Sequence, residues 1–356
     1  MLIKIFKKSK FLVKVYEGIF GPVHWLVYVL KNTQWPSLER THFSYGKLNR
    51  DKKFYVIKYA RPECGIFSMI LHLMPQIEYA VRKKYIPIID CRETYLPILQ
   101  DPENAGKENP WEYYFEQPGG SYSLDEVYQS KHVIYVRPNG WGIRRSLNYN
   151  DMQLSEKELH YWSALFNQYI RPNKVIQERI CCEKRCFPKE QKILGVYVRA
   201  EYRWGGMVGN KLFYQHPKVS DCGTFITLVE QKMNEWGYSW IFVSCDDREY
   251  SDKIARYFGD KCIRMDRPLW CLFENGVPQE EKQIMREYEK YTIQKKMEDY
   301  IVETYLLSQC DALFACMGTG AQYAYVINGG KYSHFQIYND GLWTMEEIEQ
   351  YRAHSK

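Results

Sequence analysis

The chain has 356 residues, of which 45% are hydrophobic and 16% aromatic, and its formal net charge is +6. This composition is typical of a globular protein and excludes a disordered chain, while the length exceeds what one hydrophobic core usually serves, so we expect two domains. The eleven cysteines are scattered, and the one cluster, Cys181, Cys182 and Cys186, lacks the paired spacing of a zinc site. We therefore expect reduced thiols and a cytoplasmic location.

The first 31 residues hold most of the net charge. They contain six lysines and one glutamate, so they supply five of the six positive charges and leave a nearly neutral remainder, which argues against a nucleic-acid partner. The stretch has no apolar run of about 20 residues that would span a bilayer, and no signal-peptide cleavage site. It either lies peripherally in the interface of an anionic membrane, on the cytoplasmic face, or packs as a helix on the protein's own domain.

Strands and helices alternate in the N-terminal half. Residues 54–59 alternate like a strand, residues 65–80 indicate a loop that feeds a helix, and residues 85–90 indicate the next strand. Another strand is predicted at residues 131–136. These elements predict a first α/β unit.

Two further features of this half concern single side chains. Trp111 and Phe115 follow a polar stretch over residues 101–110 and either stack on a sugar or pack in the core, which we favour. Ser155 and Glu158 have the spacing of a capping box and predict a helix that runs to about Tyr169.

The C-terminal half repeats one design four times. An apolar strand ends on an arginine at 193–199, and three later apolar strands run into small or acidic residues at 240–247, 261–266 and 311–320. Helical patterns lie between them, which indicates a parallel sheet with right-handed crossovers. Residues 177–192 are interpreted as the crossing between the halves.

The predicted fold class is α/β, with two Rossmann-like domains that face a cleft. The N-terminal α/β domain is expected on the acceptor side and the C-terminal domain around the nucleotide. The predicted bounds are a basic N-terminal segment over 1–50, the N-terminal domain over 51–180, the C-terminal domain over 181–340 and a C-terminal helix over 341–356.

Arg199 ends the strand that begins the C-terminal half. A cation at the carboxyl end of a buried strand either binds an anion, most plausibly a phosphate, or forms a salt bridge with a neighbouring helix. Gly65, which opens the helix after the first strand, either approaches a phosphate or makes a simple turn. Gly318 and Thr319 repeat this design with a hydroxyl added, and they favour phosphate binding although the dinucleotide fingerprint is absent.

Three polar residues after the C-terminal strands keep two interpretations each. Asp246 and Asp247 are either a general-acid pair or a helix cap. His216, which precedes Pro217, either meets the ligand or shapes an extended turn before a helix.

Several of these segments together resemble a known family. The order Gly-Val-Tyr-Val-Arg199, His216-Pro217, Phe-Val-Ser-Cys-Asp-Asp247 and Glu303-Thr-Tyr-Leu-Leu-Ser-Gln-Cys-Asp311, followed by Gly318-Thr319, resembles the GT-B-type fucosyltransferases of the α1,6-fucosyltransferase and nodulation fucosyltransferase group. Cys64-Gly65 and Trp111-Glu112-x-x-Phe115 also resemble that group. The resemblance covers about residues 61–328, and the Ser-Gln-x-Asp block is its most specific part.

The resemblance implies a role for each matching residue. Arg199 matches the arginine that grips the donor diphosphate, and Glu303 matches an acidic residue that contacts guanine. Gly318 and Thr319 fall where small or hydroxyl residues meet the phosphates. Gly65 and Ile66 fall in the loop that touches the nucleotide from the other domain. The resemblance further implies an inverting reaction without a metal or other cofactor, in which GDP-fucose is the donor and a glycan or lipid-linked saccharide the acceptor.

The chain departs from the family pattern beside Arg199. Ala200 stands where the α1,6 enzymes carry a second arginine, and Tyr197 replaces a histidine that helps to hold guanine. The loop between Arg199 and His216 is also several residues longer than the corresponding loop of the α1,6 enzymes. These departures leave the donor open, and they keep a non-catalytic nucleotide- or carbohydrate-binding protein as the alternative function.

Sugar transfer from a nucleoside diphosphate needs two kinds of group. Arg199 would stabilise the negative charge that develops on the departing diphosphate. A carboxylate near the acceptor hydroxyl would take its proton, and Glu201 is nearest in sequence, with Glu112, Asp246 and His216 as competitors.

Overall fold

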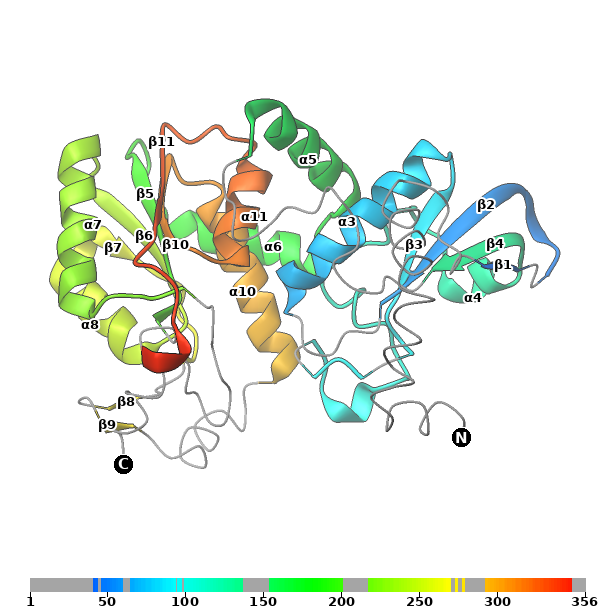
Figure 1. Cartoon of the computed structure of the whole chain (residues 1–356), viewed down its shortest axis with the longest axis horizontal. Coiled ribbons are helices and arrows are strands. Elements are labelled where there is room, and N and C mark those ends of the chain that lie inside the picture. The colour runs from blue at the N-terminus through cyan, green and yellow to red at the C-terminus, as the bar shows by residue number, and fades with distance from the viewer. Residues whose placement is uncertain are drawn as a thin grey trace, which may run out of the picture.

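The computed structural model describes residues 41–43, 46–59, 65–93, 95–97, 99–136, 154–200, 217–269, 273–274, 277–278 and 292–347. Two sheets lie toward opposite ends of the molecule, with helices between them (Figure 1). Several predicted features lie outside the described residues, among them the basic segment over 1–31 and the loop over 201–216.

The N-terminal half is built on a four-stranded sheet in the order β1-β4-β2-β3. Strand β2 runs parallel to β3 and β4, and β1 is antiparallel to β4. The bounds are β1 (Thr41–Phe43), β2 (Leu48–Lys58), β3 (Ile86–Asp90) and β4 (Ser130–Val136). Strands β2, β3 and β4 confirm the strands predicted at residues 54–59, 85–90 and 131–136. Strand β2 begins earlier than predicted. The prediction left out its first residues because they are mostly polar and exposed and lack the apolar alternation of a half-buried strand.

Helices cover both faces of this sheet. Helix α3 (Ile66–Arg82) packs on one face with Tyr55 and Ile57, and the short α4 (Leu124–Tyr128) packs on the other with Phe54 and Val56. Alternate residues of β2 therefore serve opposite cores, as the side-chain period of a strand requires.

A long connection with little regular structure follows β3. It contains the 3₁₀ turn η1 (Pro102–Asn104) and two aromatic residues, Trp111 and Phe115, for which the sequence allows either sugar stacking or core packing. Trp111 and Phe115 are buried, and their rings stack with centroids 4.7 Å apart. Core packing is confirmed.

Helices α5 (Glu156–Tyr169) and α6 (Lys174–Glu183) connect the halves, and the 3₁₀ turn η2 (Lys184–Cys186) follows them. The predicted capping box is present, since Ser155 accepts from the Glu158 backbone while the Glu158 carboxylate accepts from the Ser155 backbone. Helix α6 extends into residues 177–192, which the sequence interpretation assigned to a crossing without a helix. The helical hydrophobic pattern is weak here because Ile176 and Ile180 are the only buried residues of α6.

The C-terminal half contains a five-stranded, all-parallel sheet in the order β11-β10-β5-β6-β7. The strand bounds are β5 (Ile193–Val198), β6 (Trp240–Cys245), β7 (Cys262–Ile263), β10 (Ala312–Cys316) and β11 (His334–Tyr338). The four predicted strands are confirmed, although β7 ends sooner than expected. Strand β11 is missing from the prediction because it lies at an edge and is only partly buried.

Helices flank this sheet on both sides, so the half has three layers (Figure 1). Helices α7 and α8 lie on the outer face, and α10 and α11 lie on the face toward the N-terminal half. Their bounds are α7 (Cys222–Trp236), α8 (Arg248–Phe258), α10 (Ile293–Leu307) and α11 (Thr319–Asn328). The remaining elements among the described residues are the turn η4 (Gly259–Lys261) and the paired strands β8 (Phe273–Glu274) and β9 (Val277–Pro278).

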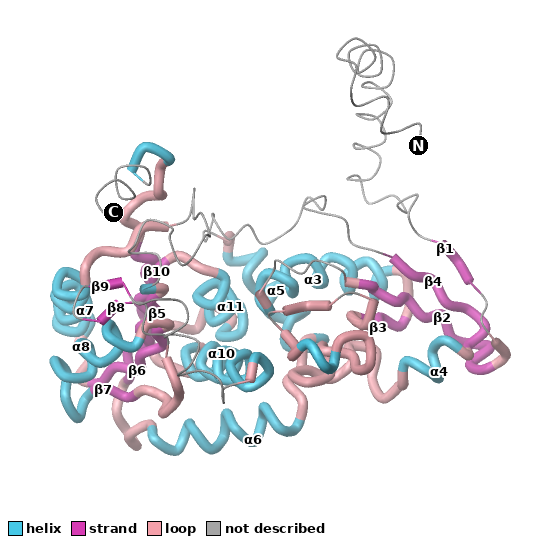
Figure 2. The backbone as a smooth tube through the Cα atoms, turned by 90° about the horizontal axis from the view of Figure 1, so that it is seen from below, coloured by secondary structure: helices cyan, strands magenta, loops and turns pink. Residues whose placement is uncertain are grey.

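One hydrophobic core extends across both halves. It joins residues of β2 and α3 to residues of α5, α10 and α11, whose positions between the two sheets appear in Figure 2. Phe67 of α3 stacks on Tyr323 of α11 with ring centroids 5.3 Å apart and meets the edge of Tyr300 in α10 at 5.2 Å. The two sheets are separate, but their inner helices share a core. The predicted domain bounds stay a prediction.

Two findings concern the ends and the surface of the described chain. Within the predicted C-terminal helix over 341–356, residues 341–344 are not helical and residues 345–347 are, while residues 348–356 lie outside the described part. Within the described ranges, no helix has both the length and the apolar character that a bilayer crossing requires.

Candidate nucleotide-binding site

The C-terminal sheet has one topological switch point. The chain passes from β5 to β6 and β7 on one side and then adds β10 and β11 on the other. In open α/β sheets, ligands bind outside the carboxyl ends of the strands at such a point. Arg199 follows β5 directly, and a Cβ atom placed on Gly318, just beyond β10, would lie 3.7 Å from Cγ of Arg199. The structure thus brings the predicted arginine and the predicted glycine turn together.

Tyr197 supports the turn from Gly318 to Gly320. A Cβ atom on Gly318 would lie 3.2 Å from the Tyr197 hydroxyl, and one on Gly320 would lie 2.6 Å from the hydroxyl of Tyr300. The backbone therefore approaches these tyrosines more closely at Gly320 than a larger residue allows. Tyr197 is 1% exposed, and its hydroxyl lies 3.3 Å from that of Tyr300. Its predicted contact with a ligand stays a prediction.

Helices α3 and α11 differ from the other described α-helices in how they begin. The six others, α4, α5, α6, α7, α8 and α10, start with a side chain that accepts a hydrogen bond from the first turn, whereas α3 and α11 start at Gly65 and Gly318 without one. Helix starts of this kind present backbone N–H groups to an anion. The two helices also contact each other through Phe67 and Tyr323. Ile66 is fully buried, and its predicted contact with a ligand stays a prediction.

The Arg199 guanidinium faces Asp246, the residue that follows β6. Nε of Arg199 lies 2.8 Å from Oδ2 of Asp246, and each side chain is about a quarter exposed. A salt bridge is one of the two roles that the sequence leaves open, although the partner lies after a neighbouring strand instead of on a helix. Pairs this exposed contribute little stability, so a diphosphate can compete with Asp246 for the guanidinium.

Asp247 has a different role from Asp246. Its carboxylate accepts from the backbone N–H of Tyr250 at 2.8 Å and caps α8. The helix-cap interpretation is confirmed for Asp247.

Glu303 in α10 is held by an arginine that sequence analysis missed. Nε of Arg267 donates to Oε1 of Glu303 at 2.6 Å, and Nη2 donates to Oε2 at 2.8 Å. Ser244 in β6 donates to the same Oε2 at 2.8 Å, and Nη2 of Arg267 also donates to the Cys245 carbonyl at 2.9 Å. The only signal for Arg267 in the sequence is its position shortly after a predicted strand.

A cavity of about 310 Å³ opens at the carboxyl ends of β6 and β7. Charged side chains from the start of α8 and from the loop after β7 dominate its wall, which is lined by Arg248, Asp252, Arg264, Met265, Asp266, Arg267, Pro268 and Leu269. Its volume is at the low end of small-molecule sites, which suits a ring system such as a nucleobase better than a whole nucleotide sugar.

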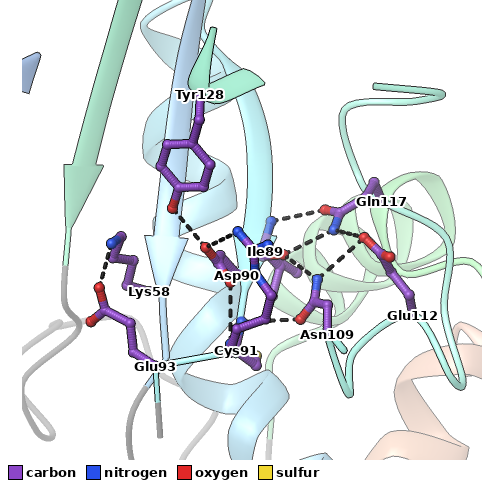
Figure 3. Close-up of polar contacts among 10 residues, drawn as sticks. Lys58, Ile89, Asp90, Cys91, Glu93, Asn109, Glu112, Gln117 and Tyr128 are labelled. Carbon is purple, nitrogen blue, oxygen red and sulfur yellow. Dashed lines mark hydrogen bonds and ion pairs between the residues drawn. The ribbon is translucent and has the colours of Figure 1, made fainter. Parts of the chain in front are cut away.

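The carboxyl edge of the N-terminal sheet carries a second polar cluster (Figure 3). Asp90 at the end of β3 is 3% exposed and accepts from Nε of Arg92 at 3.0 Å and from the Tyr128 hydroxyl at 2.6 Å. Burial raises the pKa of Asp90, but the hydrogen bonds from Arg92 and Tyr128 outweigh it, so the pKa is lowered. Lys58 at the end of β2 pairs with Glu93 and lies 4.9 Å from the centroid of the Tyr135 ring.

Two buried amides orient an exposed carboxylate beside this cluster. Asn109 and Gln117 each donate to Oε1 of Glu112, at 3.2 and 2.6 Å, and each also donates to the Ile89 carbonyl. The amide oxygens accept in turn from the backbone of β3 and of Cys91, as Figure 3 shows. The two amides hold the Glu112 carboxylate in place. Because Glu112 is exposed, this carboxylate is also open to a ligand.

Two predicted site residues, Glu201 and His216, lie outside the described residues. Thr319 is the first residue of α11 and is partly exposed. Across the described ranges, no group of three His, Cys, Asp or Glu side chains is placed to hold a metal ion. The cysteines that the structure describes are free thiols.

No protein-family model matches the chain, and no curated protein sequence matches it. Among solved structures it is similar to the fucosyltransferase NodZ from Bradyrhizobium, with 14% identity and a TM-score of 0.43 over 77% of this chain and 92% of that one. It is also similar to a variant of FUT1 from Arabidopsis thaliana in complex with GDP, with 12% identity and a TM-score of 0.44 over 93% and 79% of the two chains. A third similar structure is POFUT1 in complex with GDP, with 9% identity and a TM-score of 0.43 over 81% and 99%.

Proposed function

We propose that this protein is an inverting, metal-independent glycosyltransferase that moves a sugar from a nucleotide donor, GDP-fucose in the simplest case, onto a glycan or a lipid-linked saccharide. The observation that carries the proposal is the convergence of Arg199 and the turn from Gly318 to Gly320 at the switch point of a parallel sheet. The choice of GDP-fucose depends on the resemblance of these segments to GT-B-type fucosyltransferases. No cofactor is part of the proposed reaction.

The proposed donor site suits a leaving diphosphate. Departure of the diphosphate leaves negative charge on its oxygens and positive charge on the anomeric carbon. Arg199 and the first N–H groups of α11 would stabilise the negative charge more strongly in the transition state than in the ground state. Thr319 would add a hydroxyl donor, and Gly65 would bring the N–H groups of α3 to the same anion.

Proton removal from the acceptor is assigned to a carboxylate. We keep Glu201 as the proposed base because it follows Arg199 closely in the sequence. Two of its competitors lie in the described part: Asp246 already faces Arg199, and Glu112 is oriented by Asn109 and Gln117. Glu112 is therefore the stronger alternative.

Nucleotide binding and sugar transfer test the proposal separately. The purified full chain is heated with GDP, GDP-fucose, UDP and ADP in turn, and a ligand at 100 times its Kd should stabilise the folded state by about 2.7 kcal/mol. Incubation with GDP-fucose and a panel of glycan acceptors, followed by mass analysis, then detects transfer. Stabilisation by GDP with neither transfer nor slow donor hydrolysis would favour a binding protein, and no response to any nucleotide would contradict both functions.

The basic segment over 1–31 is proposed to place the enzyme at an anionic membrane surface, which suits a lipid-linked acceptor. Full-length chain and a variant that lacks these residues are sedimented with vesicles that contain anionic lipid. Loss of recovery in the shortened variant supports the location, and equal recovery contradicts it.

A further inference from the structure

Arg267 stands between the cavity at β6 and β7 and the buried carboxylate of Glu303. It lines the cavity, and its guanidinium donates to both oxygens of Glu303. Glu303 does not line the cavity and is only 3% exposed. A ligand in the cavity therefore meets Arg267 before it meets Glu303.

The contacts around Arg267 fix the plane of its guanidinium. Glu303 holds two of its nitrogens, the Cys245 carbonyl accepts from one of these, and Ser244 anchors the Glu303 carboxylate to β6. The side chains of Arg267 and Glu303 are 10% and 4% exposed, so solvent screens their attraction weakly. An arginine ordered in this way loses little further side-chain freedom when a ligand binds.

The cavity lies where the nucleoside of the proposed donor would extend. Phosphates at the ends of β5 and β10 leave the base one or two strands away, and neighbouring strands are about 4.8 Å apart. That span reaches the ends of β6 and β7, where the cavity opens. This placement of the base rests on the proposed function, because only a nucleotide at the switch point would direct a base to this place.

Guanine presents two different edges to a protein. Its O6 and N7 atoms accept hydrogen bonds and are complementary to arginine, while its N1 and 2-amino groups donate and are complementary to a carboxylate. The resemblance to fucosyltransferases implies that Glu303 contacts the base. In this chain both Glu303 oxygens already accept from Arg267, so the cation is the group turned to the cavity.

We infer that Arg267 contacts the acceptor edge of the nucleobase, and that Glu303 and Ser244 are positioning residues that hold its guanidinium against the cavity. Base selection in this protein then depends on O6 and N7 of the base and not on a direct contact between Glu303 and the 2-amino group.

Ligand analogues that change one edge at a time test the inference. Calorimetry measures the Kd of GDP, of its deaza analogue in which carbon replaces N7, and of IDP, which lacks the 2-amino group. We expect the wild-type protein to bind the deaza analogue about tenfold more weakly than GDP, and IDP within about twofold of GDP. Arg267→Met should bind GDP about tenfold more weakly and no longer distinguish it from the deaza analogue.

Two further variants separate this effect from damage to the fold. Arg267→Met leaves the Glu303 charge buried without its partner, so the double variant Arg267→Met/Glu303→Leu removes both charges and should keep the fold and the same loss of discrimination. Arg264→Met is the matched control, because Arg264 lines the same cavity but pairs with Asp252. It should still discriminate against the deaza analogue.

The outcomes distinguish the inference from the proposed function. The inference is overturned if the wild type binds GDP tightly and IDP more weakly, and if Glu303→Gln loses that difference while Arg267→Met keeps it. The proposed function would remain intact in that case. If the wild type binds no guanine nucleotide, the GDP-dependent function and the inference both fail.

Discussion

The carboxyl edges of the two parallel sheets carry different chemistry. At the C-terminal sheet, two arginines each face a carboxylate, with Arg199 opposite Asp246 and Arg267 opposite Glu303, and Arg199 also lies beside the turn at Gly318. At the N-terminal sheet, two buried amides hold Glu112, while Asp90 accepts from the Tyr128 hydroxyl and pairs with Arg92 on its own loop. We therefore expect the first edge to bind a ligand with fixed negative charge, and we expect Glu112 at the second edge to bind the hydroxyl groups of a neutral sugar.

Removal of Arg199 should give the largest effect. Arg199→Ala is expected to lower the rate of sugar transfer about 100- to 1,000-fold, because the leaving diphosphate loses a charged donor aimed at it. Transfer is measured by mass analysis of the product, and thermal unfolding verifies the fold. Arg256→Ala, at an exposed position of α8, is the matched control and should transfer normally. Normal transfer by Arg199→Ala would remove the donor site from this edge.

Asp90 tests the other edge through stability. Asp90→Asn should lower the free energy of unfolding at neutral pH by about 2 kcal/mol, since a buried carboxylate loses charge-assisted hydrogen bonds from Arg92 and Tyr128. Chemical denaturation measures the change, and Asp51→Asn at an exposed strand position serves as the control.

The effect of Asp90→Asn should also depend on pH. The folded-state pKa of Asp90 is lowered from its ordinary value of 3.8, so its stabilisation is present above about pH 4 and is lost as the pH falls through the folded-state pKa. The difference between wild type and variant should therefore shrink in acid. A constant difference from pH 7 to pH 2 would show that the carboxylate charge does not contribute.

Local sequence patterns predicted the elements that carry the C-terminal site. Arg199 and Gly318 follow apolar runs long enough to be strands, and parallel strands place their carboxyl ends at one edge, so their proximity follows from the fold class. Asp247 also follows from a local rule, because an acidic residue that precedes a helix by one position caps it.

The side chains that complete the site could not be predicted in this way. Arg267 contacts Glu303 across 36 positions of sequence, and Gln117 contacts β3 across 28, so no local period records either pair. The position of Arg267 is hard to predict for a second reason. Strand β7 has only two residues, so Arg267 lies in a loop where no strand alternation indicates which way its side chain points. The shared core between the halves was missed for the same reason, since it depends on contacts such as Phe67 with Tyr323.

Glu112 gives a smaller effect that sharpens the division between the edges. Glu112→Gln should raise the KM for the acceptor about tenfold and leave kcat and donor binding unchanged, because the oriented carboxylate loses a charged hydrogen bond to an acceptor hydroxyl. Steady-state kinetics with varied acceptor measures both constants. Glu116→Gln is the matched control, since Glu116 is an exposed carboxylate nearby that pairs with Arg171. A large fall in kcat with unchanged KM would make Glu112 the base in place of Glu201.

Asp246 should give the smallest effect, and one of opposite sign. Asp246→Asn removes a negative charge that lies 2.8 Å from the Arg199 guanidinium, so a diphosphate would no longer compete with it, and GDP should bind about two- to fivefold more tightly. The gain is limited because both side chains are partly exposed and solvent screens their attraction. Calorimetry at low and high salt measures it, and the gain should decrease as salt rises. Weaker GDP binding in this variant would mean that Asp246 orients Arg199 for the ligand, and the ion pair would then be a working part of the donor site instead of its competitor.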